Sequence, residues 1–150
     1  MTLIEALIAM AISAVIIGGL TAGIYTITDV TGRGDAEIKA LRDIQSVSWW
    51  ISNDARMARQ ASLTGGSPAT GIILQWDDGN GTPYISSYTF SGTELVREYN
   101  GDATTVAWNV SAAEFSMTGD VLAYTIISSP PGRWQVSRIV DGQVNLRAYQ

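Results

Sequence analysis

Residues 1–28 read MTLIEALIAMAISAVIIGGLTAGIYTIT, an apolar stretch in which Glu5 is the only charged residue. As an α-helix this stretch would be about 42 Å long at ~1.5 Å per residue, longer than the roughly 30 Å hydrocarbon core of a bilayer. A secretory signal peptide begins with basic residues, whereas the first basic residue here is Arg33. The stretch therefore predicts a membrane-spanning helix that is not a secretory signal.

Glu5 is unusual because it lies one turn inside this apolar helix. An acid at the bilayer centre costs about 2.5–3.5 kcal/mol, so it needs a partner unless it reaches water at the headgroup surface. The natural cation is a free α-amino group at Met1, but this group lies along the axis of the same short helical turn. We expect the amine of a neighbouring subunit to approach Glu5 more easily.

The first nine residues, MTLIEALIA, resemble the mature N-terminus of type IV prepilins and pseudopilins. The shared features are a hydrophobic first residue, a T-L-I-E core and a glutamate at the fifth place, although Met1 replaces the commoner phenylalanine. The resemblance implies that Met1 is the processed, N-methylated terminus and that Glu5 neutralises the N-terminal amine of an adjacent subunit. The segment Asp54–Ala61, with the sheet expected after it, resembles the minor-pseudopilin branch.

The resemblance also implies the partners and the location of the chain. They are a prepilin peptidase and an assembly machinery, the inner (cytoplasmic) membrane as the anchor before assembly, and other copies of the chain in a helical filament. The filament would be extracellular, on the cell surface.

Composition argues against several other classes of function. The chain has 150 residues, which suits one globular domain beside the apolar segment, and its formal net charge is -5. Nucleic-acid binding is disfavoured because there is no basic arm. The sequence has no cysteine and no histidine, so a disulfide framework, a thiolate metal site and a Ser-His-Asp triad cannot be built. We expect no enzymatic activity, no cofactor and no metal ion.

Five glycines mark two places where the N-terminal helix could loosen. The first place has Gly18, Gly19 and Gly23, and the second has Gly32 and Gly34. The first three follow or lie among β-branched residues and form the weakest helical stretch of the apolar part, because each glycine costs about 1 kcal/mol relative to alanine. In an assembled filament, we predict that any break in the apolar helix falls within Ile16–Gly23. A hinge at Thr31–Gly34 is the competing prediction.

A second helical pattern follows, with apolar residues at three- and four-residue spacing from Ala40 to Ala61. It predicts a helix over 36–63 that packs its apolar stripe on a sheet, with charged residues such as Asp43 largely off that stripe. Trp49 and Trp50 are adjacent and cannot both lie on the stripe. Either Trp50 caps the core edge while Trp49 lies under a loop, or Trp49 contributes to a subunit contact, where tryptophan is enriched.

Strand patterns dominate after Pro68, because β-branched and aromatic runs alternate with turn residues. The predicted strands are Gly71–Asp77, Tyr84–Phe90, Glu94–Tyr99, Thr104–Val110, Glu114–Met117, Leu122–Ser128, Trp134–Val140 and Gln143–Tyr149. Asp141-Gly142 is typical of a two-residue hairpin. Asp77, Asp78 and Asn80 could offer oxygen ligands to calcium, but a simple turn explains them better. Asn80 and Asn109 begin N-glycosylation sequons.

These patterns predict an α+β fold with two parts. Residues 1–35 form the apolar N-terminal helix and a hinge; residues 36–150 form a globular domain, with the helix at 36–63 and an antiparallel β-meander at 71–149. The expected function is that of a structural pilin subunit of a type IV pilus-like filament. The alternatives are a minor pseudopilin of a type II secretion or competence pseudopilus, and a filament-tip adhesin or binding module.

Overall fold

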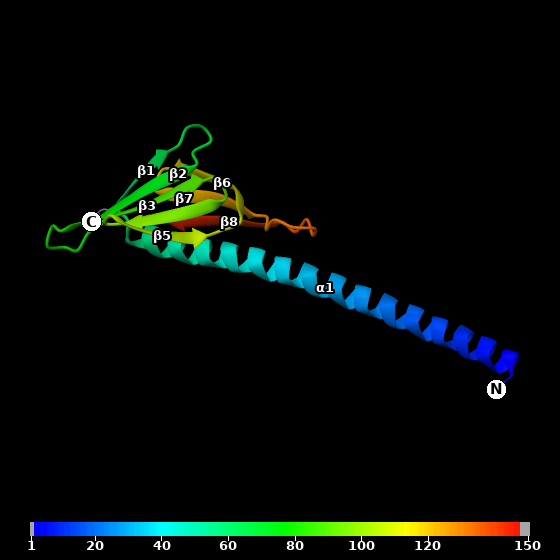
Figure 1. Cartoon of the computed structure of the whole chain (residues 1–150). Helices are drawn as coiled ribbons and strands as arrows, with labels where there is room; N and C mark the ends of the chain where they lie inside the picture. The colour runs from blue at the N-terminus through cyan, green and yellow to red at the C-terminus, as the bar shows by residue number, and fades with distance from the viewer. Residues whose placement is uncertain (1, 148–150) are drawn as a thin grey trace. The chain divides into compact units, whose positions relative to one another are not determined.

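The computed structural model describes residues 2–147 and confirms an α+β fold, in which a long N-terminal helix packs on antiparallel β-sheets (Figure 1). The elements are α1 Leu3–Met57, β1 Gln60–Thr64, β2 Gly71–Asp77, β3 Pro83–Ser91, β4 Glu94–Tyr99, β5 Asp102–Ala107, β6 Val110–Thr118, β7 Val121–Ser128 and β8 Arg138–Asn145. The bounds of β2 and β4 are those that the residue patterns predict.

The chain divides into two compact units, Met1–Asp35 and Ala36–Gln150. α1 is helical without interruption from Leu3 to Met57, so it includes the glycines at which loosening is predicted and the predicted hinge at Thr31–Gly34. Glycines weaken a helix by about 1 kcal/mol each but do not by themselves end it. The predicted break concerns an assembled filament, and it stays a prediction.

The helix ends six residues earlier than the predicted Leu63. Residues Gln60–Thr64 instead form β1, which pairs with β2 from Gln60↔Gln75 to Thr64↔Gly71. The pairing begins directly after the helix, where the backbone N–H of Arg59 donates to the carbonyl of Gln75 at 2.8 Å. The three-residue spacing of Ala58 and Ala61 continues a helical pattern by chance, and pairing with β2 overrides it.

The strands form two antiparallel sheets where the residue patterns predict one meander. The first sheet has the order β1-β2-β3-β4-β5 and the second has the order β6-β7-β8. They are joined at β6, where the N–H of Val110 donates to the carbonyl of Thr93 at 2.9 Å and Phe115 forms a bridge with Ala69. Each sheet is a meander in itself, because its strands neighbour one another in chain order.

The predicted hairpin at Asp141-Gly142 is wrong. Both residues lie inside β8, which pairs with β7 through Thr125↔Asp141 and Tyr124↔Gly142. The Tyr124 ring occupies the space that a Cβ atom on Gly142 would need. Glycine is therefore present because an aromatic ring covers it across the strands, not because the chain reverses there. The predicted strand Gln143–Tyr149 also extends into residues 148 and 149, which lie outside the described residues.

One apolar core fills the unit Ala36–Gln150. α1 contributes Val47, Ile51 and Ala55, which are fully buried at helical spacing. The sheets contribute buried side chains from strands of both, among them Ile72, Leu74, Tyr88, Leu95, Leu122 and Ile126. The C-terminal half of α1 thus presents one face to both sheets and leaves the opposite face to solvent.

Candidate assembly site

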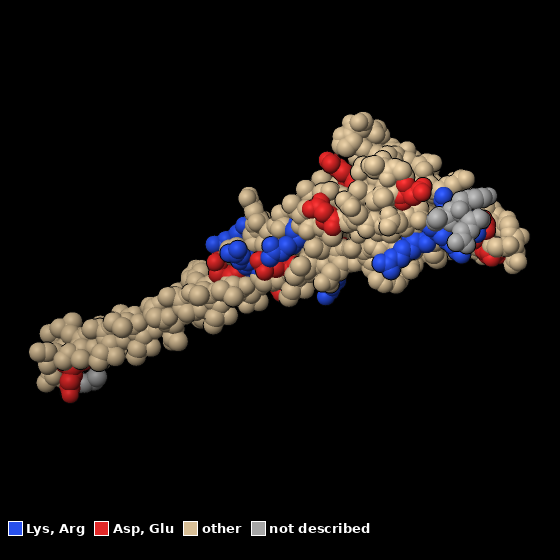
Figure 2. All heavy atoms as spheres, turned by 180° about the vertical axis from the view of Figure 1, so that it is seen from behind, with Lys and Arg blue, Asp and Glu red and all other residues tan. Residues whose placement is uncertain are grey.

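The apolar part of α1 is the first candidate for function because nothing among the described residues covers it. Each large apolar side chain between Leu3 and Ile27 has 55% or more of its surface exposed; Leu3 is 83% exposed and Ile27 is 68% exposed. The helix is long and apolar enough to cross a membrane, and no residue of its most apolar 18-residue stretch is buried. Figure 2 shows the segment as an uncharged surface with a single acidic patch near its N-terminal end. This surface is compatible with membrane anchoring.

Glu5 accounts for that acidic patch, since the next charged residue is Asp29. Its Oε2 atom accepts a hydrogen bond from the backbone N–H of Thr2 at 2.9 Å and a longer one from Thr2 Oγ1 at 3.4 Å. Thr2 precedes the helix and Glu5 is its third residue, which is the spacing of a capping box. Glu5 is therefore held by its own helix end. Met1, the other predicted assembly residue, lies outside the described residues.

Three threonine hydroxyls within the apolar part are satisfied inside the helix. The hydroxyls of Thr21, Thr26 and Thr28 donate to the carbonyls four residues earlier at 2.8–3.0 Å. Gly18, Gly19, Gly23 and Gly34 face open space, so no close contact explains their lack of a side chain. A hydroxyl that bonds back to the helix costs little in a bilayer, because no polar group is left unpaired.

Trp49 is 60% exposed, so it does not lie under a loop, whereas Trp50 packs against the core. The two rings meet edge to face with their centroids 4.6 Å apart. The Arg97 guanidinium lies 4.5 Å from the Trp50 centroid and 4.7 Å from that of Tyr99, so it makes a cation–π contact with each of the two rings. Trp49 remains available for a subunit contact.

Asp54 is a buried acid at the centre of a polar network that the residue patterns do not reveal. Its Oδ2 atom accepts hydrogen bonds from Ser86 Oγ and the Tyr88 hydroxyl, both at 2.6 Å, and from Arg97 Nε at 2.7 Å. Arg97 Nη2 donates to Oδ1 at 3.1 Å, which makes the ion pair bidentate. Asp54 has no exposed surface. It therefore attaches α1 to β3 and β4 of the first sheet.

The network shifts the ionisation of its other members. Burial, and then the charge and hydrogen bond of Asp54, raise the pKa of the Tyr88 hydroxyl above its usual range. Burial opposes the charge on Arg97, but the hydrogen bonds and charge of Asp54 outweigh burial and raise the pKa of the guanidinium. A neutral tyrosine and a charged arginine are both stabilised by the same carboxylate.

Asp43 attaches α1 to the second sheet by hydrogen bonds, as Asp54 attaches it to the first. It accepts from Ser128 Oγ at 3.0 Å, from Asn109 Nδ2 at 2.9 Å, and from the backbone N–H groups of Trp108 and Asn109 at 3.3 Å. It is 7% exposed, so its predicted position largely off the apolar stripe is wrong. The Asn109 nitrogen that a glycan would occupy is engaged in this contact.

The spacing of Asp43 and Asp54 in the sequence is the feature that could have predicted their burial. Asp43 and Asp54 are eleven residues apart, close to three helical turns, and each lies three residues after a buried member of the stripe, Ala40 or Ile51. An acid at such a position must have hydrogen-bond partners, but the sequence does not name them.

The acidic loop between β2 and β3 is a turn stabilised by its own carboxylates. Asp78 Oδ1 accepts from the backbone N–H groups of Asn80 at 2.8 Å and Thr82 at 3.1 Å, and these bonds lower the pKa of Asp78. Asp77 pairs with Arg59 at 2.8 Å. Within residues 2–147, no group of three or more acids has an arrangement that could hold a metal ion.

No protein-family model, curated protein or solved structure shows significant similarity to the chain.

Proposed function

We propose that the chain is a structural subunit of a type IV pilus-like filament, anchored in the cytoplasmic membrane before assembly and exposed on the cell surface afterwards. One observation carries the proposal: the uncovered apolar part of α1, up to Thr28, bears a single acid, Glu5, in its first turn. The apolar helices would bundle in the filament core, and the units Ala36–Gln150 would form the outer layer. The chemistry is assembly, with no catalytic step and no cofactor.

The local geometry of Glu5 supports pairing with a neighbouring subunit. Both hydrogen bonds from Thr2 go to Oε2, and Oε1 accepts no bond from any described residue. The capping contact therefore restricts the carboxylate while it leaves one oxygen for the N-terminal amine of an adjacent copy. That attraction would be about 4 kcal/mol at ~4 Å and an effective dielectric near 20, which exceeds the roughly 2.5–3.5 kcal/mol cost of an acid within the bilayer.

Substitution of Glu5 tests the proposal in cells that assemble the filament. Glu5→Leu should leave the subunit in the membrane fraction with its sheets folded, because the change removes no contact with them, but sheared filaments should be lost or much reduced. The yield is measured by shearing, sedimentation and immunoblotting, with the membrane fraction as the loading control.

Glu5→Gln separates charge from capping, because its amide oxygen can still accept the Thr2 bonds while it carries no charge. We expect this variant to assemble poorly as well. Normal filament yield from Glu5→Leu would refute the proposed pairing, and normal yield from Glu5→Gln alone would assign the role of Glu5 to the helix cap.

A further inference from the structure

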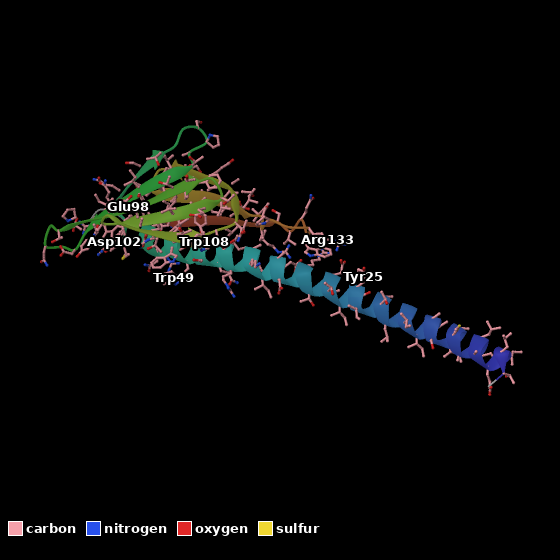
Figure 3. The ribbon with its side chains drawn as sticks, in the orientation of Figure 1. Tyr25, Trp49, Glu98, Asp102, Trp108 and Arg133 are labelled. Atoms are coloured by element: carbon pink, nitrogen blue, oxygen red, sulfur yellow. The ribbon has the colours of Figure 1, made fainter. Side chains whose placement is uncertain are left out.

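The solvent face of α1 within the unit Ala36–Gln150 carries a continuous exposed stripe. We call its residues the outer stripe; they are Ile38, Arg42, Gln45, Trp49, Asn53 and Arg56. They recur at spacings of three and four, on the side of the helix opposite the buried face. The stripe contains two cations and no acid, and Trp49 points away from the sheets (Figure 3).

A large aromatic side chain on such a stripe is poorly explained by the fold of one chain. Trp49 contacts Trp50 by one edge but leaves 60% of its surface exposed. Trp49 and Arg56 border the same shallow depression of the helix surface. Neither Arg42 nor Arg56 forms an ion pair with any residue between 2 and 147. Tryptophan and arginine are among the side chains enriched at the energetic centres of protein interfaces.

The outer face of the first sheet carries a hollow whose lining contains an acid and no cation. It has a volume of about 420 Å³ and is lined by Pro83, Ile85, Ser87, Glu98, Asn100 and Gly101. Side chains alternate along β3, so Ser86 and Tyr88 point to Asp54 and the core while Ile85 and Ser87 point outward. Ile85 is 43% exposed, and Glu98 lies beside it, opposite Ser87. We call this surface the Ile85–Glu98 hollow.

The two surfaces match in chemistry and in spacing. One presents an aromatic ring and an arginine; the other presents an exposed isoleucine with a proline, and a glutamate that makes no ion pair among the described residues. Trp49 and Arg56 are about 10.5 Å apart along the helix at ~1.5 Å per residue. Ile85 and Glu98 are diagonal cross-strand neighbours, about 7–8 Å apart. The flexible arginine side chain can span the difference.

We infer that the outer stripe of one copy docks into the Ile85–Glu98 hollow of the next, with Trp49 against Ile85 and Arg56 beside Glu98. The inference rests on the proposed function, because it names the surfaces through which neighbouring outer units meet. The surfaces lie on different elements, so each copy offers both halves of the contact. Such a heterologous contact repeats from copy to copy and generates a filament unless the ring closes.

Disulfide cross-linking tests this contact directly, since the chain has no cysteine of its own. Asn53→Cys lies on the outer stripe between Trp49 and Arg56, and Ser87→Cys lies in the hollow. Filaments of the full-length double-cysteine variant should give a ladder of covalent multimers after mild oxidation. Each single variant should stay monomeric. The pair Asn53→Cys with Ser62→Cys is the matched control, because Ser62 is an exposed β1 residue outside the hollow.

Charge exchange gives a second readout in the same filaments. Arg56→Glu and Glu98→Arg should each reduce filament yield about tenfold or more, because like charges then face each other, and the combined variant should restore most of the loss. Unchanged tryptophan fluorescence of the variants checks their fold.

The outcomes separate this inference from the proposed function. Normal filaments without a 53–87 ladder, a covalent dimer from Asn53→Cys alone, or no rescue by the charge exchange would overturn the contact and leave the pilin proposal standing. A wild-type chain that never enters filaments would refute the pilin proposal itself.

Discussion

Replacing Asp54 with alanine should strongly destabilise the unit Ala36–Gln150. The change removes a buried acceptor of four hydrogen bonds and leaves the Arg97 guanidinium, whose side chain is 12% exposed, without its counter-charge. Removing one partner of a buried ion pair costs about 3–5 kcal/mol. Domains of this size are stable by only about 6–17 kcal/mol at roughly 0.05–0.15 kcal/mol per residue. Asp54→Ala should therefore remove a large part of the free energy of unfolding.

Urea unfolding of the full chain in detergent micelles measures the effect, with tryptophan fluorescence as the signal, because all five tryptophans lie after residue 48. A loss of about 4 kcal/mol lowers the midpoint by about 2 M urea if the slope is ~2 kcal/mol per molar. Glu98→Ala is the matched control, since this acid is exposed and should change stability by less than about 0.5 kcal/mol.

Asp54→Asn keeps the measurement possible if the alanine variant fails to fold. Its oxygen can replace Oδ2 toward Ser86 and Tyr88, but its NH2 group then faces the Arg97 Nη2 donor. We expect an intermediate loss of about 2–3 kcal/mol. A midpoint for Asp54→Ala within about 0.5 M urea of the wild type, at an unchanged slope, would refute the idea that this carboxylate stabilises the attachment of α1 to the first sheet.

Two further outcomes follow from the same unit. Because the Tyr88 pKa is raised on folding, the unfolded chain releases that proton first above pH 10, so stability should fall there by up to about 1.4 kcal/mol per pH unit. Between pH 9 and 11 the urea midpoint of the wild type should therefore fall as pH rises. This fall should be smaller in Tyr88→Phe and unchanged in the exposed control Tyr25→Phe; an equal fall in both variants would contradict the assignment. Gly142→Ala should cost about 1–3 kcal/mol in the same assay, because its Cβ would collide with the buried Tyr124 ring. Gly34→Ala, which meets open space within a helix, should be neutral or stabilising, and an equally neutral Gly142→Ala would argue against the collision.

Part of the candidate site is readable from local pattern. The apolar run before Asp29, the lone Glu5 within it, and the T-x-x-E spacing that caps the helix are all properties of neighbouring residues. The strands β2 and β4 are likewise predicted to the residue, because alternation and flanking turn residues are local signals. The adjacent Trp49 and Trp50 require that one ring leave the core, but not which one.

The partners of Asp43 and Asp54 could not be predicted, because they lie 32 to 85 residues away in the chain. A charge on an apolar helix stripe shows that partners must exist, and only the packing of two sheets on α1 decides which donors arrive. The outer stripe and the Ile85–Glu98 hollow are similar: spacing places the exposed residues of α1, but the register of β3 with β4 brings Ile85 and Glu98 together.

The sequence by itself determined the apolar N-terminal helix, its single acid and the alternation of most strands, since these depend on the periodicity and hydropathy of contiguous residues. Tertiary structure decided where the helix ends, since pairing of Gln60–Thr64 with β2 outweighs the helical spacing of Ala58 and Ala61. It also decided that Asp141-Gly142 continues a strand, because the Tyr124 ring lies across the glycine. A local pattern offers a preference worth about 1 kcal/mol per residue, and long-range packing can reverse it.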